Sequence, residues 1–600
     1  MSALAEAGAS GHDNAAFGVA RSFTGRRWVL RAATDDAIRA LCARGGLPPL
    51  LARLLAARGI APDGVETLLN PTLRALLPEP LSLKDMNRAV ERVRRAIVQD
   101  EPIAVFGDYD VDGSASAALM SDFLAAIGRK PRIYIPDRMT EGYGPNVAAF
   151  LKLKEEGARV IVTVDCGAAA TAALEAARGA GVDVIVLDHH AIEAVPPAYA
   201  QVNPNQPGDT SGLGHLSAAG VTFLFLVALN RALRDAGWYA ASGVAEPDLR
   251  DSLDLVALAT VCDVVPLVGV NRAFVRAGLA KLSALGRPAM RALSSAGAIA
   301  PPFTTYHLGY VLGPRINAGG RVGKCSLGVE LLTERDAARA DEMAALLDLH
   351  NRERQALEKL ILEEATALAQ AQADAPFVLV HGEGWHSGVV GIVAGRLKDR
   401  FNKPALVAGF EGGMGRGSAR SVAGVDIGAL VRGAHAAGLL HSGGGHAMAA
   451  GFSLDAAKIG AFRSFLLEQF ASHGEALDLA GELELDLAIS PSGATPAFVE
   501  EVARLGPFGA GNPEPLLVAA DVRLAYADTV GRDHVRMRLV GGDGARLDAI
   551  AFRSVGQPLG NGLFQARGGR IHAAGRLRID EWNGRVRLQF VVEDAAPAGA

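Results

Sequence analysis

Between residues 101 and 190 the chain alternates short apolar runs rich in β-branched residues with Ala- and Leu-rich stretches of helical length. The apolar runs, predicted to be strands, cover residues 103–106, 132–135, 160–164 and 182–187. Helical stretches lie between them at residues 115–127, 147–153 and 168–177. This alternation predicts βαβ units around a parallel sheet, whose strands are apolar throughout because helices cover both faces. The fold class that follows is α/β.

A second long feature is the stretch at residues 333–373, which is rich in Ala, Leu, Glu and Arg and contains neither Pro nor Gly. Thr333 and Asp336 resemble a capping box at its start, and Pro376 follows its end. At 1.5 Å per residue such a helix reaches on the order of 55 Å, more than one globular domain needs. We therefore expect it to connect two domains.

The length of 600 residues is too great for one hydrophobic core. After the connecting helix, strands predicted at residues 377–380 and 405–408 and a Gly-rich stretch at 412–451 indicate a second α/β domain. Later segments alternate apolar and polar residues, and Asn583-Gly584 is typical of a hairpin turn, which predicts a small antiparallel β-domain. The predicted parts are a lead-in with a small accessory segment (1–70), a first α/β domain (71–332), the connecting helix (333–373), a second α/β domain (374–474) and the β-domain (475–600).

Charge and cysteine usage narrow the class of protein. A net charge of -5 and a pI of 6.3 exclude a surface coated in positive charge, although a nucleic-acid enzyme needs only a locally basic channel. The four cysteines show no Cys-x-x-Cys spacing, which indicates neither a zinc ribbon nor a disulfide framework. The longest apolar run, residues 221–229, falls well short of the roughly 20 residues that cross a bilayer. The first 25 or so residues lack the features of a signal peptide, so we expect a cytoplasmic protein without membrane contact.

Ionisable residues stand where the predicted strands end. They are Asp108, Asp110 and Asp112 after the first strand, Asp165 after the third, and Asp188, His189 and His190 after the fourth. A further acid, Asp263, follows a predicted helix at residues 253–261. Ligands gather at the carboxyl ends of strands in open parallel sheets, so these groups are expected to converge at one edge. Clustered carboxylates repel one another unless a cation neutralises them, which predicts a metal site.

The ligand types indicate the metal and the chemistry. Carboxylates with an imidazole suit Mn²⁺ or Mg²⁺, and the acids suffice for two ions, which points to phosphoester hydrolysis. An EF-hand loop starting at Asp108 is disfavoured because its twelfth residue is Leu119 rather than Glu. Cys166 and Cys262 stand beside two of the acids. Thiolate ligation is conceivable there, but packing as a small apolar residue is the commoner role of such a cysteine.

Several motifs occur in an order that characterises a known superfamily. The metal-site motifs are Asp110-Val-Asp112-Gly, Asp165, Asp188-His189-His190 and Cys262-Asp-Val-Val-Pro-Leu267. In these the chain resembles the DHH phosphoesterase superfamily, and in Ser442-Gly-Gly-Gly-His446-Ala-Met-Ala-Ala-Gly-Phe452 it resembles the companion DHHA1 domain. Further motifs make the chain, over about residues 70–595, similar to the branch of this superfamily that degrades single-stranded DNA. These motifs are Pro136-Asp-Arg138 with Glu141-Gly-Tyr-Gly144, Gly313-Pro-Arg315-Ile-Asn317-Ala, Trp385-His386-Ser-Gly-Val-Val-Gly391 and Gly506-Pro-Phe-Gly-Ala-Gly-Asn512-Pro.

The resemblance implies a 5′-to-3′ exonuclease of DNA recombination and repair that depends on two Mn²⁺ or Mg²⁺ ions. The implied ligands are Asp108, Asp110 and Asp165 for one ion and Asp112, Asp165, His189 and Asp263 for the other. Asp165 would bridge the two ions. His190 would contact the scissile phosphate or assist the leaving group, with Asp188 as a second catalytic residue. The family would also place an OB-fold at the C-terminal end.

The same motifs contain candidate substrate-binding residues. The resemblance assigns recognition of a 5′-phosphate to Arg138, Ser418 and Arg420. Arg416, Ser418 and Arg420 alternate along an extended segment, so their side chains can share a face and hold a phosphate. The remaining candidates are Arg315, Asn317, Arg321, His386, Gly444, Gly445 and His446. The glycines permit close approach of a nucleic-acid backbone, although a tight turn would also explain them.

In the last domain arginines recur at spacing two, which places them on one face of a sheet. The pairs are Arg536 and Arg538, Arg576 and Arg578, and Arg585 and Arg587. They fit the basic groove of an OB-fold, with Phe508, Tyr526 and Trp582 as candidate stacking platforms, and a solvated sheet face is the alternative. Because aromatic residues make up only 6% of the chain, we expect electrostatics to outweigh stacking and binding to be salt-sensitive.

Two other functions are alternatives. A phosphodiesterase for short oligoribonucleotides or cyclic dinucleotides would use the same chemistry, but such enzymes usually need only the two α/β domains. A catalytically silent DNA-binding scaffold of replication is expected to lack metal ligands, and every acid named above is present. As partners the resemblance implies single-stranded DNA, a single-stranded-DNA-binding protein and a helicase.

Overall fold

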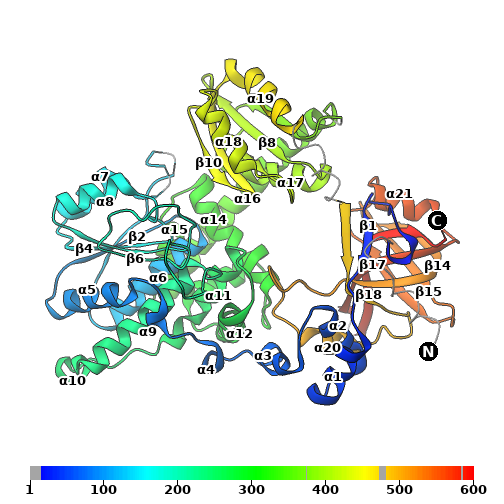
Figure 1. Ribbon diagram of the computed structural model, residues 1–600, viewed down its shortest axis with the longest axis horizontal. Coiled ribbons are helices and arrows are strands. Elements are labelled where there is room, and N and C mark those ends of the chain that lie inside the picture. The colour runs from blue at the N-terminus through cyan, green and yellow to red at the C-terminus, as the bar shows by residue number, and fades with distance from the viewer. Residues whose placement is uncertain are drawn as a thin grey trace.

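The computed structural model describes residues 15–599 except 139, 143, 373, 472–480 and 583–584. Figure 1 shows two α/β domains, one above the other, and a β-barrel beside them. The α/β class with an additional β-domain, expected from the sequence, is confirmed. These three units determine which side chains can meet.

The first α/β domain is built on a parallel five-stranded sheet. In spatial order its strands are β3 (Arg132–Tyr134), β2 (Ile103–Gly107), β4 (Val160–Val164), β5 (Asp183–Leu187) and β6 (Ala200–Val202). Successive side chains of a strand point to opposite faces. Val105 and Val162 belong to the core on one face, whereas Ala104 and Ile161 belong to the core on the other. The apolar strands predicted from the sequence are therefore covered on both sides.

Helices form the two covering layers of this sheet. The helices on one face are α5 (Met86–Val98), α6 (Val111–Ala126) and α9 (Ala218–Asp235), and those on the other are α7 (Val147–Glu155) and α8 (Thr171–Gly179). The first layer continues into a helical extension. Its elements are α4 (Leu73–Leu76), η3 (Pro80–Ser82), α10 (Trp238–Ser242), η4 (Leu249–Ser252), α11 (Leu253–Cys262), α12 (Gly269–Ser283), α13 (Pro288–Ala296), η5 (His307–Leu312), α14 (Gly313–Val322) and α15 (Leu327–Thr333).

The connecting helix is α16 (Ala337–Gln370), which has 34 residues. Its start differs from the predicted capping box, because Asp336 itself is the N-cap and accepts a hydrogen bond from the backbone N–H of Arg339. Thr333 instead donates its hydroxyl to the Val329 carbonyl within α15. The buried residues Ala344 and Leu347 pack in the core of the first domain, whereas Ile361 and Ala365 pack in that of the second. The helix thus belongs to both cores.

The second α/β domain has a mixed five-stranded sheet. In spatial order its strands are β10 (Ser442–His446), β11 (Ala449–Asp455), β9 (Met414–Arg420), β8 (Ala405–Glu411) and β7 (Val378–Glu383), of which only β7 and β8 pair in parallel. Its helices are α17 (Ser387–Phe401), α18 (Ile427–Ala436), η6 (Ala456–Lys458) and α19 (Ile459–Ala471). One core lies between the sheet and α17 with the end of α16, and the other lies under α18 and α19.

The C-terminal domain is a closed five-stranded barrel. Its strands are β14 (Leu517–Val530), β15 (His534–Val540), β16 (Arg546–Ala551), β18 (Arg585–Pro597) and β17 (Arg570–Trp582), and β17 pairs back to β14. The short strand β13 (Leu487–Ala488) and the helices α20 (Pro496–Ala503) and α21 (Pro558–Gln565) accompany it. The predicted turn at Asn583-Gly584 and the side chains of Trp582 and Arg585 lie outside the described residues.

The N-terminal segment packs against this barrel, at the opposite end of the sequence (Figure 1). Its elements are η1 (Ala16–Gly18), β1 (Arg27–Leu30), α1 (Asp35–Gly45), α2 (Pro49–Ala57), η2 (Pro62–Gly64) and α3 (Val65–Leu69). Leu51 and Leu55 share a core with barrel residues such as Leu517, and β1 pairs in parallel with β12 (Glu482–Leu485). The accessory segment predicted from the sequence is therefore part of the barrel lobe.

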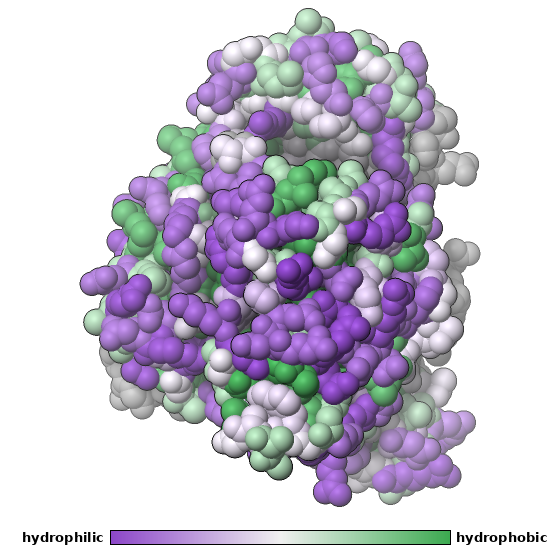
Figure 2. Space-filling view, turned by 90° about the vertical axis from the view of Figure 1, so that its left-hand side faces the viewer, coloured by the Kyte–Doolittle hydropathy of each residue, from purple (hydrophilic) through white to green (hydrophobic). Residues whose placement is uncertain are grey.

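The surface offers hydrophilic residues over most of the face drawn in Figure 2, with hydrophobic residues in small separate patches. Among the helices that the structure describes, none combines the length and the hydrophobicity required of a membrane span.

Candidate metal centre and active site

The carboxyl edge of the parallel sheet gathers the acids that the sequence placed there. Asp108 directly follows β2, Asp165 directly follows β4, and Asp188 begins the triplet after β5. Asp110 is the N-cap of α6 and accepts a hydrogen bond from the Gly113 N–H at 3.0 Å. Asp263 is the C-cap residue of α11 and comes from outside the sheet. Strand and helix ends thus aim these side chains at one point.

Local backbone geometry explains two residue choices at this edge. A Cβ atom on Gly113 would lie 2.5 Å from the carbonyl oxygen of Asp108, so only glycine lets the first turn of α6 approach that strand end. Asp165 has a φ of 61°, a conformation that few residues other than glycine adopt. Such strain is typical of functional positions.

The acids and His189 form three overlapping groups whose ligand atoms lie within 4.8 Å of one another. The groups are Asp108 with Asp110 and Asp165; Asp112 with His189 and Asp263; and Asp165 with His189 and His190. The Nε2 atom of His189 lies 3.5 Å from oxygens of both Asp165 and Asp263 and 3.9 Å from Asp112. Asp165 therefore belongs to two of the three groups, one with Asp108 and Asp110 and one with the two histidines.

Burial and mutual repulsion disfavour the ionised form of the aspartates in this cluster. Burial, followed by the charge of neighbouring aspartates, raises the pKa of Asp108 and Asp165 well above the ordinary value. The same two causes raise the pKa of Asp112 and Asp263. For Asp112 the rise in pKa is partly offset, because its two oxygens accept hydrogen bonds from the Ala218 and Ala219 N–H groups at the start of α9. A bound cation would relieve the remaining repulsion.

His189 fits the role of a ligand. Burial lowers its pKa to about 4, so the imidazole is neutral near pH 7 and can offer a lone pair. Its buried Nε2, Oδ2 of Asp263 and Oδ1 of Asp108 have no hydrogen-bond partner within the described residues. Buried atoms of this kind have lone pairs to offer to a metal ion, and a set that is mostly carboxylate oxygens fits hard cations such as Mn²⁺ or Mg²⁺.

Asp188 and His190 form a separate pair beside the cluster. Asp188 is buried and accepts hydrogen bonds from the N–H groups of Ala168, His189 and His190 and from Nδ1 of His190. Burial tends to lower the pKa of His190, but the hydrogen bond and charge of Asp188 outweigh it and raise the pKa to about 9. His190 is therefore a cation, and Asp188 orients it rather than facing the cavity itself.

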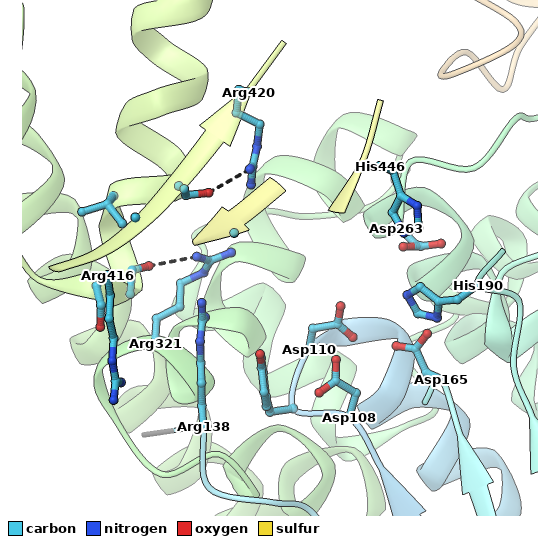
Figure 3. Close-up of a pocket in the computed structure, with 18 residues that line it drawn as sticks. Asp108, Asp110, Arg138, Asp165, His190, Asp263, Arg321, Arg416, Arg420 and His446 are labelled. Atoms are coloured by element: carbon cyan, nitrogen blue, oxygen red, sulfur yellow. Dashed lines mark hydrogen bonds between the residues drawn. The ribbon is translucent and has the colours of Figure 1, made fainter. Parts of the chain in front are cut away.

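A cavity of about 550 Å³ opens over this cluster and extends to the second domain. Figure 3 shows the acids and His190 on one side of it and a set of arginines on the other, with His446 above Asp263. The residues of the second wall are Arg138, Arg321, Arg416, Ser418 and Arg420, together with Ser387 and Gly388 at the start of α17. The two walls carry opposite charge.

The arginine wall is built from β9, from α14, from the start of α17 and from the loop that carries Arg138. Arg420 donates to the Ser418 hydroxyl at 2.9 Å, and Arg321, from α14, donates to the Gly388 carbonyl at 2.9 Å. A Cβ on Gly391 would come within 3.3 Å of the Arg420 guanidinium. Glycine at this position therefore gives the Arg420 side chain room to pack against α17. Arg138 stacks over the ring of Tyr109 at 5.3 Å.

These cations lack acidic partners. Within the described residues no ion pair involves the four arginines of this wall. Burial and the neighbouring Arg138 lower the pKa of Arg321 to about 10, which leaves it charged near pH 7. Guanidinium groups gathered at a helix N-terminus form a site for a phosphate-like anion.

Three family models match the chain in the order of its domains. They are the DHH family N-terminal domain at residues 102–260, the DHHA1 domain at residues 374–472 and the RecJ OB domain at residues 485–594. The single-stranded-DNA-specific exonuclease RecJ of Bacillus subtilis (strain 168) is 34% identical over 95% of this chain and 71% of its own length. The RecJ of Dickeya dadantii (strain 3937) is 36% identical over 92% of this chain and 96% of its own. The chain belongs to the RecJ family.

The crystal structure of RecJ from Thermus thermophilus in complex with Mn²⁺ superposes on this RecJ-family chain with a TM-score of 0.80. It is 30% identical, and the match covers 96% of this chain and 80% of that one. A structure of the same Thermus thermophilus protein with Mg²⁺ also matches, with a TM-score of 0.74. The agreement extends over all the domains described above, and the closed barrel matches the OB domain of the family.

Five of the substrate-binding candidates of this RecJ-family chain do not line the cavity: Arg315, Asn317, His386, Gly444 and Gly445. Arg315 pairs with Asp348 at 2.9 Å and donates to the Val311 carbonyl, which holds α14 to α16. Asn317 accepts a hydrogen bond from the Val111 N–H and so supports the start of α6. His386 is the N-cap of α17 and accepts from the Gly388 N–H. These side chains support the walls of the site.

The two glycines lie in β10, which ends at His446. Gly445 has a φ of 149°, and a Cβ there would lie 2.4 Å from the Ala449 carbonyl oxygen, so the residue serves the tight hairpin. The alternative explanation offered by the sequence, a tight turn, fits Gly445. Of this motif, His446 and Gly451 line the cavity.

Sequence reasoning missed several residues of the cavity. Tyr109 stands inside the acidic motif, and Ser387, Gly388 and Gly391 stand inside the motif that contains His386. The signal that could have found them is the helix that starts after His386, since the N–H groups of a helix N-terminus attract anions. In that motif the backbone and the small residues face the cavity, while the histidine caps the helix.

Two further expectations are answered by the contacts. Cys166 donates its thiol to the Val164 carbonyl, and Cys262 donates to Leu308, while burial raises the pKa of both. Both cysteines therefore pack as thiols, as the commoner role predicts. In the barrel, three of the arginines predicted to make a basic groove pair with acids, which neutralises their charge locally. Arg538 pairs with Asp548, Arg576 with Glu514 and Glu593, and Arg578 with Glu514.

Proposed function

We propose that this chain is an exonuclease that hydrolyses single-stranded DNA to mononucleotides from the 5′ end, in DNA recombination and repair. The observation that carries the proposal is the cavity in which an acidic, metal-ligating wall faces an arginine and serine wall. The first wall fits the chemistry of phosphodiester cleavage, and the second fits a terminal phosphate. The curated RecJ relatives bear the name of single-stranded-DNA-specific exonucleases.

Two Mn²⁺ or Mg²⁺ ions complete the site in this proposal. Asp108, Asp110 and Asp165, which form one group of ligand atoms, would hold one ion; Asp112, His189 and Asp263, which form another, would hold the second ion together with Asp165. When bound, such ions neutralise phosphate charge and supply hydroxide near neutral pH. Asp165 would contribute to both positions, since it shares a group with Asp108 and Asp110 and its Oδ1 lies 3.5 Å from Nε2 of His189.

The arginine wall decides where the strand is cut. Arg416, Ser418 and Arg420 hold a 5′-terminal phosphate, with N–H groups at the start of α17 as additional donors. Arg138 and Arg321 approach from the first domain and contact the same end of the strand. With its end held there, the strand presents the following phosphodiester to the acidic wall, and one nucleotide is released per cut.

His190 supplies the proton chemistry. Held by Asp188 and lining the cavity, it carries a proton that it can donate to an oxygen of the scissile phosphate or to the departing group. Asp188 contributes by orientation, since its Oδ1 accepts hydrogen bonds from its own loop and its Oδ2 accepts one from the Ala168 N–H.

We place the activity in the cytoplasm, and we propose a single-stranded-DNA-binding protein and a helicase as partners by family resemblance. The four cysteines are free, which fits a reducing compartment. Co-purification of the full chain with each candidate partner tests the assignment, and absence of both at physiological salt contradicts it.

The proposed function is tested with the purified chain, Mn²⁺ and single-stranded DNA labelled at either end. Release of labelled mononucleotides from the 5′ end, with the 3′ label lost last, is the expected result. The matched control is Asp165→Ala, which is expected to bind DNA without cutting it. Rapid cleavage of dinucleotides or short oligoribonucleotides without attack on DNA would support the alternative phosphodiesterase and overturn the proposal.

A further inference from the structure

Two tyrosines stand exposed on the helix that leads to the cavity. Tyr306 is 62% exposed and Tyr310 is 74% exposed, although tyrosine rings gain free energy by burial. The rings stack on each other, with centroids 5.2 Å apart and an angle of 26° between their planes. Both side chains thus remain largely exposed although they stack, and Tyr306 also makes an edge contact with the His307 ring.

The helix that carries the pair is firmly supported. The turn η5 is π-helical and runs without interruption into α14, since Leu312 and Gly313 both have helical backbone angles. Leu308 and Leu312 are buried on its inner side. A π-helical turn inside a longer helix is frequent at functional sites. The tyrosines are thus displayed on a rigid element and not on a loose loop.

The same helix reaches the active site. Arg321, near the end of α14, lines the cavity. At 1.5 Å per residue, Tyr310 lies about 16 Å from Arg321 along the helix axis. A few nucleotides of a single strand span that distance. Stacking at the tyrosines and phosphate binding in the cavity can therefore involve one strand.

Contacts also tie the pair to the metal ligand Asp263. The Cys262 thiol donates to the Leu308 carbonyl at 3.4 Å, so η5 rests on the residue before Asp263. Val264, the residue after it, is 70% exposed and has a φ of 60°, which is unusual for a β-branched residue. An exposed apolar surface thus begins directly beside the acidic wall.

On its other side the pair adjoins the link to the barrel. Thr305, one residue before Tyr306, donates its hydroxyl to the Phe508 carbonyl at 2.7 Å. The Leu267 N–H donates to the Ala510 carbonyl at 2.7 Å. The motif Gly506-Pro-Phe-Gly-Ala-Gly-Asn512 therefore joins the barrel to the first domain next to the tyrosines.

We propose that Tyr306 and Tyr310 form a stacking platform for the bases of a DNA strand that runs from the cavity towards the barrel. The proposal rests on the proposed function and adds a binding site to it. Stacking on an aromatic face suits every base, which a nuclease without sequence preference requires. A nucleobase extends the stack on an open ring face, whereas a protein partner would need a larger apolar area than two rings and one valine.

The test measures binding without cleavage. The full chain in EDTA is titrated with 5′-phosphorylated oligodeoxythymidylate that carries a single 2-aminopurine at each of the first ten positions in turn. Wild-type protein is expected to change the fluorescence strongly within a window of a few neighbouring positions. Tyr306→Ala/Tyr310→Ala is expected to lose this window and to raise Kd roughly tenfold, while Tyr306→Phe/Tyr310→Phe, which retains both rings, keeps both properties.

Controls separate this platform from other effects. Leu360→Ala, which removes an exposed apolar side chain from α16, is expected to bind like the wild type. An unchanged fluorescence window and Kd in the double alanine variant overturn the platform even if the enzyme degrades DNA. A window that depends on the tyrosines supports it even if no cleavage is found, in which case the proposed function fails alone.

Discussion

At the scale of single residues, burying the clustered aspartates lowers the stability of the metal-free protein. The folded-state pKa of Asp165 is raised, so above the ordinary aspartate pKa the metal-free protein bears a penalty for ionising it. We predict that at pH 8 in EDTA Asp165→Asn melts about 2–4 °C above the wild type. With Mn²⁺ the order reverses, and the variant loses roughly a thousandfold or more in activity. Differential scanning fluorimetry with and without Mn²⁺ measures both orders; equal melting temperatures without metal would contradict the account.

Asp188 and Asp263 allow the orienting role to be distinguished from the ligand role. Asp188 holds His190 through a 2.7 Å hydrogen bond, whereas Asp263 belongs to a group of ligand atoms. We predict that Asp188→Asn lowers kcat by roughly 10²- to 10⁴-fold and leaves the Mn²⁺ concentration for half-maximal activity unchanged. Asp263→Asn is expected to raise that concentration. Metal titrations of the two variants side by side decide the matter, and a large Mn²⁺ shift in Asp188→Asn would make it a ligand instead.

The proposed binding of the 5′-terminal phosphate by Arg420 can be tested with a single substitution. Arg420, hydrogen-bonded to Ser418, has no acidic partner in the part of the chain that the structure describes. We predict that Arg420→Ala lowers kcat/KM on 5′-phosphorylated DNA by roughly 10- to 100-fold and changes little on DNA with a 5′-hydroxyl. Paired assays on the two substrates give the ratio. Equal losses on both would show that Arg420 does not read the phosphate.

At the scale of elements, one buried arginine fastens the barrel to the first domain. Arg272, on α12, is 3% exposed and donates to the carbonyls of Leu68, Leu505 and Gly506, with no acidic partner among the residues described. Burial lowers its pKa to about 10, so it remains charged. It joins the N-terminal segment, the barrel linker and the helix after Asp263.

We predict that Arg272→Met weakens this junction by about 2–4 kcal/mol, because several carbonyls lose their donor. The barrel should then melt separately from the first domain, and activity on long DNA should fall more than activity on short oligonucleotides. Calorimetry and assays against substrates of graded length check the two consequences. A single unchanged transition would contradict the role of Arg272. Arg276→Met, on the same helix, removes hydrogen bonds to Leu69 and Asn70 of the N-terminal segment but leaves those to the barrel linker, so it is expected to leave the barrel coupled.

The sequence located most elements but not all of their ends. The strands predicted at residues 103–106 and 182–187 appear as Ile103–Gly107 and Asp183–Leu187, because runs of β-branched residues have few alternatives in a buried sheet. The edge strand β6 was missed, since its three residues carry no local pattern. The capping box at Thr333 was wrong because that hydroxyl bonds backward to its own helix.

At the scale of the whole molecule, the distribution of charge should set the salt dependence of binding. Barrel arginines such as Arg538 are paired with acids, while four arginines of the cavity are not, within the described residues. Four phosphate contacts predict a slope of about −3 in a plot of log binding constant against log salt concentration for single strands. Titrations in EDTA between low and moderate salt measure it, and Arg416→Ala should reduce the slope by about 0.7. A much steeper slope would contradict this account and would indicate that the barrel supplies most of the phosphate contacts.

The proposed metal ligands could be predicted from the sequence alone, because each of them stands beside a signal that is local in the chain. Asp108, Asp165 and His189 follow buried strands, and the carboxyl ends of parallel strands must meet at one edge. Only the tertiary structure decided which residues of a recognised motif face the substrate. Arg315 turns to Asp348 while Arg321, on the same helix, enters the cavity, since the direction of a side chain depends on what packs against its helix.

The same limit applies to contacts between distant parts of the chain. The packing of α2 on the barrel and the position of Tyr306 and Tyr310 between the metal ligands and the barrel rest on long-range contacts. No local sequence pattern predicts such contacts, because they depend on how folded elements that are distant in the chain pack against one another. The proposed metal ligands could therefore be predicted from the sequence, whereas the position of the two tyrosines relative to them became visible only in the fold.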